Sequence, residues 1–232
     1  MNAPIVIESL PTGLSFEMIK VAGGAFLMGS TEWLETQPVQ KIQVPGFYLA
    51  KYPVTQELWQ SVMGDNPANF KGKTNPVERV SWDDTQLFLE KLNQICGQNY
   101  RLPSEAEWEY TARGGRVSQG LRYAGSNKLK EVGWYDTNSH GETKPVGLKQ
   151  ANELGFYDMS GNIREWCADH WHDNYQGIPK DGSAWVKGGY SDRRVVRGGS
   201  WFFDDYFCAV SYRDWYYSNF RYYFIGFRLA RY

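Results

Sequence analysis

Cysteine is scarce in this chain of 232 residues, which contains only Cys96, Cys167 and Cys208. Small secreted domains that depend on disulfides carry more cysteines at closer spacing, whereas three scattered thiols fit a reducing compartment. The cysteine content therefore excludes a disulfide-stabilised scaffold. The fold must come from a hydrophobic core, for which an aromatic content of 16% offers ample material.

The chain also has no long apolar run and no surplus of charge of one sign. Nowhere do enough apolar residues follow one another to span a bilayer, and the start, MNAPIVIESLPTG, has neither the basic nor the apolar region of a secretory signal. We therefore expect a cytoplasmic protein. Lys and Arg number 25 against 26 Asp and Glu, so the net charge of −1 provides no field for holding nucleic acid. Neither nucleic acid nor a membrane is expected as a partner.

Glycine, in contrast, is abundant and often paired, with 24 glycines in all. Pairs such as Gly188-Gly189 and Gly198-Gly199 indicate turns between short extended pieces, because only glycine adopts positive φ without steric cost. No linker rich in Ser, Pro or charge interrupts the chain, which predicts one domain over residues 1–232. Short strands, few helices and much irregular structure make an α+β fold the expected class.

Two main helices are predicted, and each begins at a capping residue. One follows Ser81, which forms a capping box with Asp84, and its buried face is expected to contain Phe88, Leu92 and Ile95.

The other main helix follows Thr55 and ends at Gly64. Its expected apolar stripe consists of Leu58, Trp59 and Val62. A third, shorter helix is predicted after Ser104, because Ser104 and Glu107 have the spacing of a second capping box.

Seven short motifs occur along the chain in a fixed order. They are GGAFLMGS (23–30), YPVTQELW (52–59), NPVERVSWDD (75–84), YRLPSEAEWEYTARGG (100–115), NELGFYDMSGNIREW (152–166), RVVRGGSW (194–201) and IGFR (225–228). Together they resemble the formylglycine-generating enzyme, or sulfatase-modifying factor, domain, which is a version of the C-type lectin fold. The resemblance covers nearly the whole chain and implies that fold. It does not imply an activity, because oxidases and ligand-binding modules share this domain.

The resemblance also locates the catalytic site of the oxidases. In formylglycine-generating enzymes, two cysteines five residues apart follow the RGGSW motif, bind copper and activate oxygen. Carried over from Trp201, the pair falls on Phe203 and Cys208, so one of the two thiolates that copper(I) needs is missing. We therefore expect a protein without this activity, in which Cys208 is a buried apolar residue of the scaffold. A copper-dependent oxidase acting on a peptide cysteine is the alternative.

A structural calcium ion is a further implication of the resemblance, and no other cofactor is expected. In the oxidases, the stretch that matches Asp158, Gly161, Ile163 and Glu165 holds calcium through two side chains and two backbone carbonyls. Hard oxygen ligands closely spaced around a glycine suit this ion. In several relatives that keep the motif, the same polar groups hydrogen-bond the turn instead, so both roles stay open at this point.

Residues 202–224 differ in composition from the rest of the chain. This segment holds 12 aromatic residues in 23 positions, against 26 in the other 209, and it contains no Lys, Glu, Gln or Met. Its aromatics stand in adjacent groups such as Phe202-Phe203 and Tyr216-Tyr217, so neither a strand nor a helix can bury them all. Some must face solvent, where Tyr and Phe mixed with Asp, Asn and Ser form an adaptable binding surface.

The missing residue types have a genetic explanation. If AAC or AAT codons vary at both adenines, every product codon ends in C or T, and Lys, Glu, Gln, Met and Trp cannot arise. Only Trp215 breaks this rule, and we expect it to be an unvaried framework residue. The pattern resembles the variable region of a diversity-generating retroelement, in which a reverse transcriptase writes adenine-specific errors into the end of a C-type lectin-fold gene.

This second resemblance implies a non-catalytic variable protein with a hypervariable surface for ligand binding. Its partner is expected to be a protein or another macromolecule with apolar pockets and some basic character. An unvaried structural or regulatory module of the same fold is the remaining alternative.

The predicted binding surface lies between two fixed ends. Trp201, Phe227 and Arg228 are expected to hold these ends, and Arg213 and Arg221 to brace the segment between them. The predicted ligand-binding residues are Phe202, Phe203, Asp204, Asp205, Tyr206, Phe207, Tyr212, Asp214, Tyr216, Tyr217, Ser218, Asn219, Phe220, Tyr222, Tyr223 and Phe224.

Overall fold

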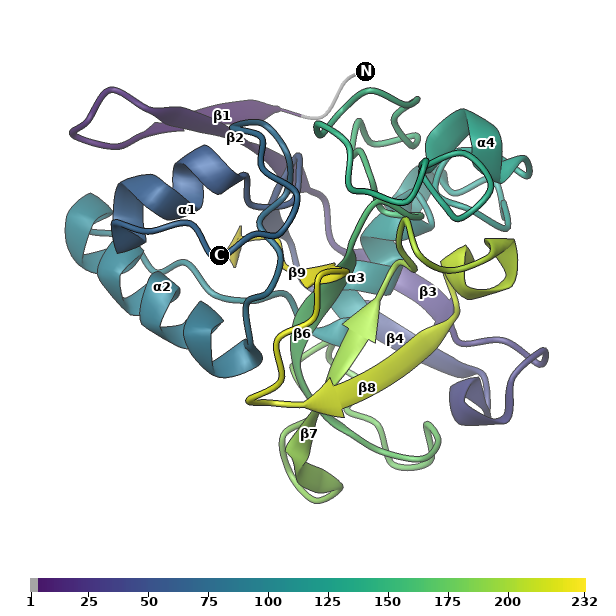
Figure 1. Cartoon of the computed structure of the whole chain (residues 1–232). Helices are drawn as coiled ribbons and strands as arrows, with labels where there is room; N and C mark the ends of the chain where they lie inside the picture. The colour runs from purple at the N-terminus through teal and green to yellow at the C-terminus, as the bar shows by residue number, and fades with distance from the viewer. Residues whose placement is uncertain (1–3) are drawn as a thin grey trace.

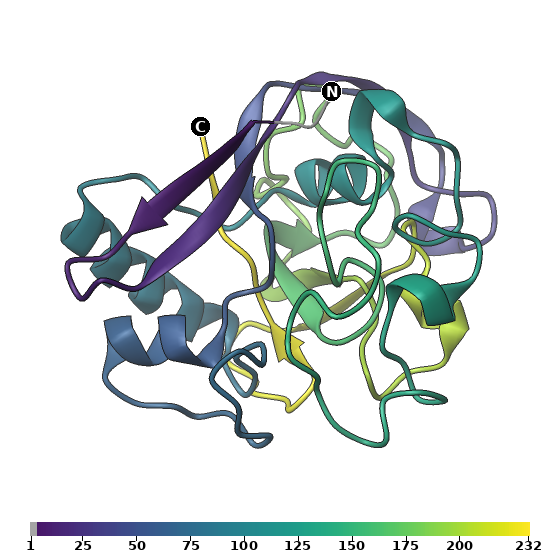
Figure 2. The ribbon, with the colours of Figure 1, turned by 90° about the horizontal axis from the view of Figure 1, so that it is seen from above.

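Three small β-sheets form the framework of the computed structural model, which describes residues 4–232 (Figures 1 and 2). The first sheet joins the two ends of the chain in the order β1 (Ile5–Ser9), β2 (Ser15–Val21), β5 (Phe47–Ala50) and β10 (Ala230–Arg231). The second contains β3 (Gly24–Met28) and β4 (Gln40–Val44). The third has the order β8 (Arg213–Tyr217), β7 (Tyr190–Arg197), β6 (Arg164–Trp171) and β9 (Ile225–Gly226).

The strand pairing in the third sheet determines where the C-terminal segment lies. Strands β6, β7 and β8 are antiparallel, and Arg194 of β7 pairs with Tyr216 of β8. The short strand β9 instead runs parallel to β6, with Ile225 opposite Arg164. The chain therefore leaves the sheet after β8 and returns to its other edge at β9. In Figure 1 this excursion crosses the front of the molecule.

Four α-helices and three short 3₁₀ turns complete the described fold. The helices are α1 (Gln56–Met63), α2 (Trp82–Cys96), α3 (Glu105–Ala112) and α4 (Leu129–Val132). The 3₁₀ turns are η1 (Leu34–Thr36), η2 (Gly115–Val117) and η3 (Asp205–Cys208). The structure thus confirms the α+β class with short strands and extensive irregular backbone. Within residues 4–232, no helix combines the length and the apolar composition that crossing a membrane requires.

The predicted helix caps are confirmed. Ser81 Oγ accepts a hydrogen bond from Asp84 N at 3.0 Å, and the Asp84 carboxylate accepts one from Ser81 N at 2.8 Å. Ser104 and Glu107 form the same reciprocal pair at α3, and Thr55 caps α1. Each cap satisfies backbone N–H groups that have no partner within the helix.

The predicted buried face of α2 is wrong at one residue. Phe88 and Leu92 are fully buried, but Ile95 is 39% exposed near the end of the helix. Leu89 and Thr85 complete the buried face instead. In the last turn of α2, Cys96 packs against the core cluster while Ile95 faces solvent, which the apolar spacing alone did not indicate.

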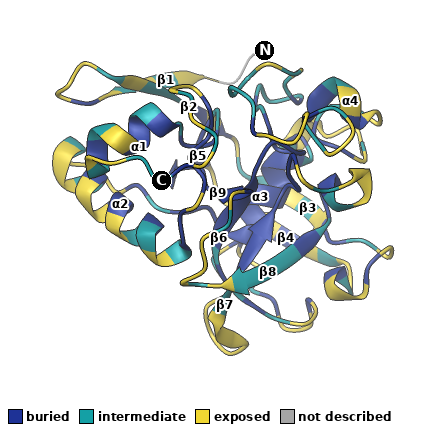
Figure 3. Ribbon diagram, in the orientation of Figure 1, coloured by how far each residue is buried: buried dark blue, intermediate teal, exposed yellow. Residues whose placement is uncertain are grey.

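Three aromatic rings in the core join α1, α2 and the segment that follows β9. Trp59 of α1 stacks on Phe88 of α2 at 5.2 Å between ring centroids, and Phe227 packs edge-on against both rings. A second cluster surrounds α3 and includes Trp108 and Phe156. In Figure 3 the buried residues concentrate in α3, β6 and the last part of β7, behind the C-terminal excursion. This excursion therefore rests on a well-packed base.

Candidate ligand-binding surface

Both ends of the C-terminal segment are held as predicted. At its start, Trp201 is buried and its indole donates a hydrogen bond to the carbonyl of Tyr223 at 3.1 Å, which ties the two ends together. At its far end, the buried Arg228 pairs with both carboxylate oxygens of Glu165 at 2.6 Å. Phe227 lies in the core. The exposed side chains between these anchors can change without emptying the core.

The two bracing arginines predicted from the sequence also make ion pairs. Arg213 is buried and contacts the Glu105 carboxylate through Nε at 2.7 Å and Nη2 at 2.9 Å. Arg221 lies at the surface and contacts both oxygens of Asp84 at 2.7 Å, which links the segment to the N-terminal cap of α2. Bidentate pairs of this kind restrict orientation as well as providing attraction.

A buried ionic network under β7 and β8 connects the first of these braces to α3. Arg197 reaches Glu105 at 3.0 Å and Glu109 at 2.5 Å, and Glu105 also holds Arg213. Burial favours the neutral form of Glu109, but the neighbouring Arg113 and Arg197 lower its pKa below the usual value. Glu109 is therefore favoured in its ionised form. Because Glu105 of α3 holds both Arg197 of β7 and Arg213 of β8, the network fixes β8 to the helix behind it.

The predicted surface residues fall into three groups by exposure, and the third, buried group contains only Phe224. The exposed ones are Phe202, Asp204, Asp205, Tyr206, Tyr217, Asn219, Phe220 and Tyr223. The half-buried ones are Phe203, Phe207, Tyr212, Asp214, Tyr216, Ser218 and Tyr222.

Phe224 is a correction, because it is only 6% exposed and belongs to the core. Its ring stacks under Phe202 at 5.6 Å and under Tyr222 at 5.1 Å. Its carbonyl accepts a hydrogen bond from Arg164 N at 2.9 Å, where the chain joins β6. Phe224 therefore supports the surface from below.

The aromatic rings touch one another in a continuous layer. From Phe224 the contacts pass through Tyr222 to Tyr216, whose rings are 5.0 Å apart. In the other direction, Phe203 contacts Phe224 at 5.2 Å and Phe207 at 5.5 Å. Rings that are held by their neighbours lose little conformational entropy when a partner binds. The arrangement suits a preorganised contact surface.

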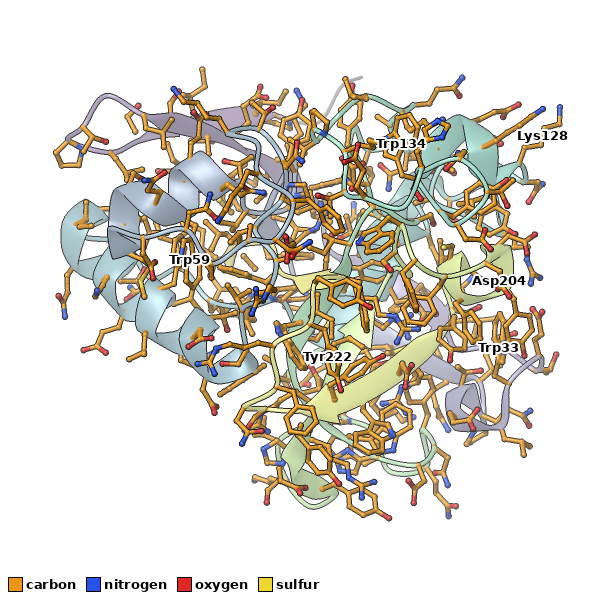
Figure 4. All side chains as sticks on the ribbon, in the orientation of Figure 1. Trp33, Trp59, Lys128, Trp134, Asp204 and Tyr222 are labelled. Carbon is orange, nitrogen blue, oxygen red and sulfur yellow. The ribbon has the colours of Figure 1, made fainter. Side chains whose placement is uncertain are left out.

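The structure adds residues that the sequence did not indicate. Trp33, in the loop before η1, packs edge-on against Tyr206 at 5.3 Å and Tyr212 at 5.6 Å. Figure 4 shows Trp33 close to Asp204, while Tyr222 lies nearer the centre of the same view. The loop before η1 thus extends the aromatic layer beyond residues 202–224.

Arg164 is a second addition and lies beneath the layer. Its guanidinium group lies 3.9 Å from the ring centroid of Phe203 and pairs with Asp214. Only its place in the NIREW motif marked this residue in the sequence, and the motif did not indicate a role in the surface. Trp215, which we expected to be a framework residue, packs partly against the second core cluster.

The positions of the oxidase cysteines are occupied by an aromatic ring and a buried thiol. Phe203 lies within the aromatic layer described above. Cys208 is fully buried, and burial raises the pKa of its thiol to about 12. Such a thiol is neither ionised near neutral pH nor open to solvent. The geometry agrees with the expectation that Cys208 is part of the scaffold.

The turn that the resemblance assigns to calcium is held by protein contacts. The Asp158 carboxylate accepts hydrogen bonds from Gly147 N at 2.8 Å and Asn162 Nδ2 at 3.3 Å, while both Glu165 oxygens contact Arg228. Across residues 4–232, no three His, Cys, Asp or Glu side chains gather as a set of metal ligands. As placed, these two carboxylates do not fit a calcium site, because each already has protein partners.

The resemblance leaves open whether Asp158, Gly161, Ile163 and Glu165 bind calcium or only hydrogen-bond the turn, and thermal melting distinguishes the two roles. Since both carboxylates are already satisfied, we expect the same melting temperature in excess calcium and in excess chelator. A midpoint that rises with calcium and falls again with chelator would instead establish a bound structural ion.

Comparison with known proteins supports the assignment of the fold and the family. The family model of the sulfatase-modifying factor enzyme 1-like domain matches residues 6–232. The chain is 36% identical to the chaperone protein LppX of Paenibacillus barcinonensis, over 82% of this chain and 80% of that protein. It is 30% identical to the formylglycine-generating enzyme of Thermomonospora curvata over 72% of this chain, but it spans only 54% of that enzyme.

Among solved structures, Treponema denticola variable protein 1 has a TM-score of 0.91 and 28% identity, with 98% of each chain covered. The structure thus has the C-type lectin fold shared by formylglycine-generating enzyme-like proteins and variable proteins of diversity-generating retroelements. The chain belongs to the family of sulfatase-modifying factor enzyme 1-like domains.

Proposed function

We propose that this protein is a non-catalytic variable protein that binds macromolecular targets, foremost proteins, through its aromatic surface. This aromatic surface consists of the exposed and half-buried residues among 202–223, and the buried Trp33 supports it from the loop before η1. One observation carries the proposal: a continuous layer of partly exposed rings stands on a base held by buried ion pairs. Large rigid side chains on a fixed base provide contact area at low entropic cost.

The residues at the two oxidase cysteine positions disfavour the oxidase. A copper(I) centre needs two accessible thiolates, whereas this chain has Phe203 in one position and a buried thiol in the other. The formylglycine-generating enzymes that the chain matches are therefore a guide to its fold more than to its chemistry. Incubation with copper and a cysteine-containing peptide, followed by mass spectrometry, should yield no aldehyde product.

A comparison of DNA sequences tests whether the surface is diversified. We expect a near copy of the last hundred or so bases of the gene close by, differing only where the copy has adenine, beside a reverse transcriptase gene. The differences should fall on codons of the exposed positions and spare those of Trp201 and Arg228. If the neighbouring DNA holds no such copy, the surface is not diversified and its residues are fixed.

A binding experiment tests the surface itself. Peptides selected from a random phage-displayed library against the intact protein should bind the Tyr217→Ser/Tyr223→Ser variant at least about thirtyfold more weakly. Both tyrosines are at least 36% exposed, so the variant should keep the stability of the parent within about 1 kcal/mol.

The matched control replaces two exposed apolar residues that do not belong to the aromatic surface. Val117→Ser/Leu148→Ser replaces side chains that are 56% and 60% exposed. We expect peptide binding to this variant to be unchanged. Equal losses in both variants would show that the peptides recognise apolar exposure in general, and the proposed surface would then be rejected.

A further inference from the structure

A pocket at one end of the aromatic surface combines aromatic walls with a free carboxylate. It lies beside β8 and has a volume of about 300 Å³. The lining residues are Trp33, Glu35, Trp171, Tyr206, Tyr212, Arg213, Asp214 and Trp215. This volume is at the small end for ligand pockets and suits one side chain of a partner rather than a whole cofactor.

The aromatic rings of this pocket pack against one another. Trp33 meets Tyr206 at 74° and Tyr212 at 82°, with ring centroids 5.3 and 5.6 Å apart, and the rings of Tyr206 and Tyr212 are 6.1 Å apart. These three rings therefore form one part of the lining, to which Trp171 and Trp215 also contribute. The face of an aromatic ring carries partial negative charge and attracts cations within about 6 Å of its centroid. A pocket with several rings in its lining therefore favours a positively charged occupant.

The chain itself shows that neighbouring rings accept guanidinium groups. Arg213 lies 4.1 Å from the ring centroid of Trp171, and Arg193 lies 4.0 Å from that of Trp215. Each of these arginines thus lies over one aromatic ring that lines the pocket. Arg164 lies 5.8 Å from the ring centroid of Tyr212, which is half-buried, whereas no Lys or Arg of the described residues lies over the ring of Tyr206. Tyr206, at 41% exposure, is therefore the main aromatic wall left for a ligand, and Tyr212 lines the pocket beside it.

The charges in the pocket leave one carboxylate without a partner. Arg213 pairs with Glu105, which also holds Arg197, and Asp214 pairs with Arg164. Glu35 is exposed, and in the part of the chain that the structure describes no Lys or Arg side chain forms an ion pair with it. The uncompensated charge among the lining residues is therefore negative.

Two further carboxylates precede the lining residue Tyr206 in the chain. Asp204 and Asp205, at the start of η3, are both exposed and lie next in sequence to the lining residue Tyr206. A cationic group that enters the pocket would thus pass a field of the favourable sign.

We propose that this pocket, called here the β8 cage, binds the cationic side chain of a basic protein segment, held by Tyr206 and Tyr212 and by the carboxylate of Glu35. The proposal rests on the proposed function, since it names the kind of partner that the aromatic surface takes. A guanidinium or ammonium group has the size, charge and affinity for ring faces that the cage requires.

Nuclear magnetic resonance titrations with small cations test the β8 cage directly. N-acetyl-arginine amide and N-acetyl-lysine amide should shift a subset of indole N–H resonances in a saturable way. N-acetyl-citrulline amide, which has the shape of arginine without its charge, should cause no saturable shift. Equal binding of the citrulline compound, or no saturable shift with either cation, would overturn the proposal.

Two variants identify the site. Glu35→Gln keeps the shape of the side chain and should weaken arginine amide binding about five- to tenfold, because the carboxylate without an ion-pair partner is lost. Tyr206→Leu should weaken it by a similar factor. The control Glu90→Gln makes the same charge change on the exposed side of α2 and should have no effect. An unchanged affinity in Glu35→Gln would contradict the assignment.

These titrations separate the cage from the proposed function. If small cations bind the β8 cage but no library peptide depends on Tyr217 and Tyr223, the cage stands and the proposed function fails. If selected peptides depend on those tyrosines but lack basic residues and the cations do not bind, the function stands and the cage fails.

Discussion

The Glu105→Ala variant should lose about 3–5 kcal/mol of the free energy of unfolding, which is enough to unfold a protein of ordinary stability. Glu105 is buried and forms ion pairs with both Arg197 and Arg213, which are themselves buried. Removing the carboxylate leaves two guanidinium groups in the interior with less compensation. This penalty exceeds the benefit of the pairs themselves, because buried charges are costly once a partner is missing.

The functional consequence follows from where the network lies. Arg213 begins β8, which carries Tyr216 and Tyr217 into the aromatic surface. Glu105→Gln keeps the volume and one acceptor oxygen, so it should lose less stability and permit a binding measurement. In this variant, affinity for the selected peptides should fall although no residue of the surface has changed.

Urea denaturation provides the measurement, and a surface pair provides the control. Glu32 contacts Arg122 through both oxygens, at 2.9 and 3.0 Å, but both side chains are more than a third exposed. Glu32→Ala should therefore cost less than about 1 kcal/mol. If Glu105→Ala and Glu32→Ala lose the same amount, burial does not set the cost and the network is not what holds β8.

Local features of this fold could be predicted from the sequence because their partners are close in the chain. The capping pairs Ser81 with Asp84 and Ser104 with Glu107 lie three residues apart, and both form as predicted. The bracing role of Arg213 was also predicted, but its partner Glu105 was not. Nothing in the sequence shows which carboxylate of α3 will face a strand more than a hundred residues away.

The residues that were predicted wrongly or missed depend on contacts between segments far apart in the chain. The adjacent aromatics in residues 202–224 indicated that some had to be exposed, but they did not indicate which. Phe224 is buried because the chain turns there into a parallel pairing with β6, and this contact is set by the whole sheet. Trp33 and Glu35 reach the binding surface from the loop around η1, so a search restricted to residues 202–224 could not include them.

Gly199→Ala should destabilise the protein by about 2–5 kcal/mol through strain and close contact at the start of the aromatic surface. Gly199 has φ of +65°, which an alanine adopts only with strain. An added Cβ would lie 2.4 Å from Cys208 Sγ, 2.8 Å from Cys208 Cα and 2.8 Å from the carbonyl oxygen of Phe207. Two of these three atoms belong to the backbone, so side-chain movement cannot relieve the contact.

Gly97, whose φ is similar to that of Gly199, allows the cost of backbone strain to be measured apart from the cost of the close contact. Gly97, which ends α2, has φ of +62° and no atom within 4 Å of an added Cβ. Gly97→Ala should therefore cost only the conformational strain, about 1–2 kcal/mol, and the remaining loss in Gly199→Ala measures the contact with η3.

Adding Cys208→Ala to Gly199→Ala removes the sulfur but leaves the backbone contacts, and most of the loss should persist. If Cys208→Ala restores stability, the thiol alone is in the way. If the loss persists, the turn positions the backbone of η3, and with it Tyr206 and Phe207, so that peptide affinity should fall together with stability.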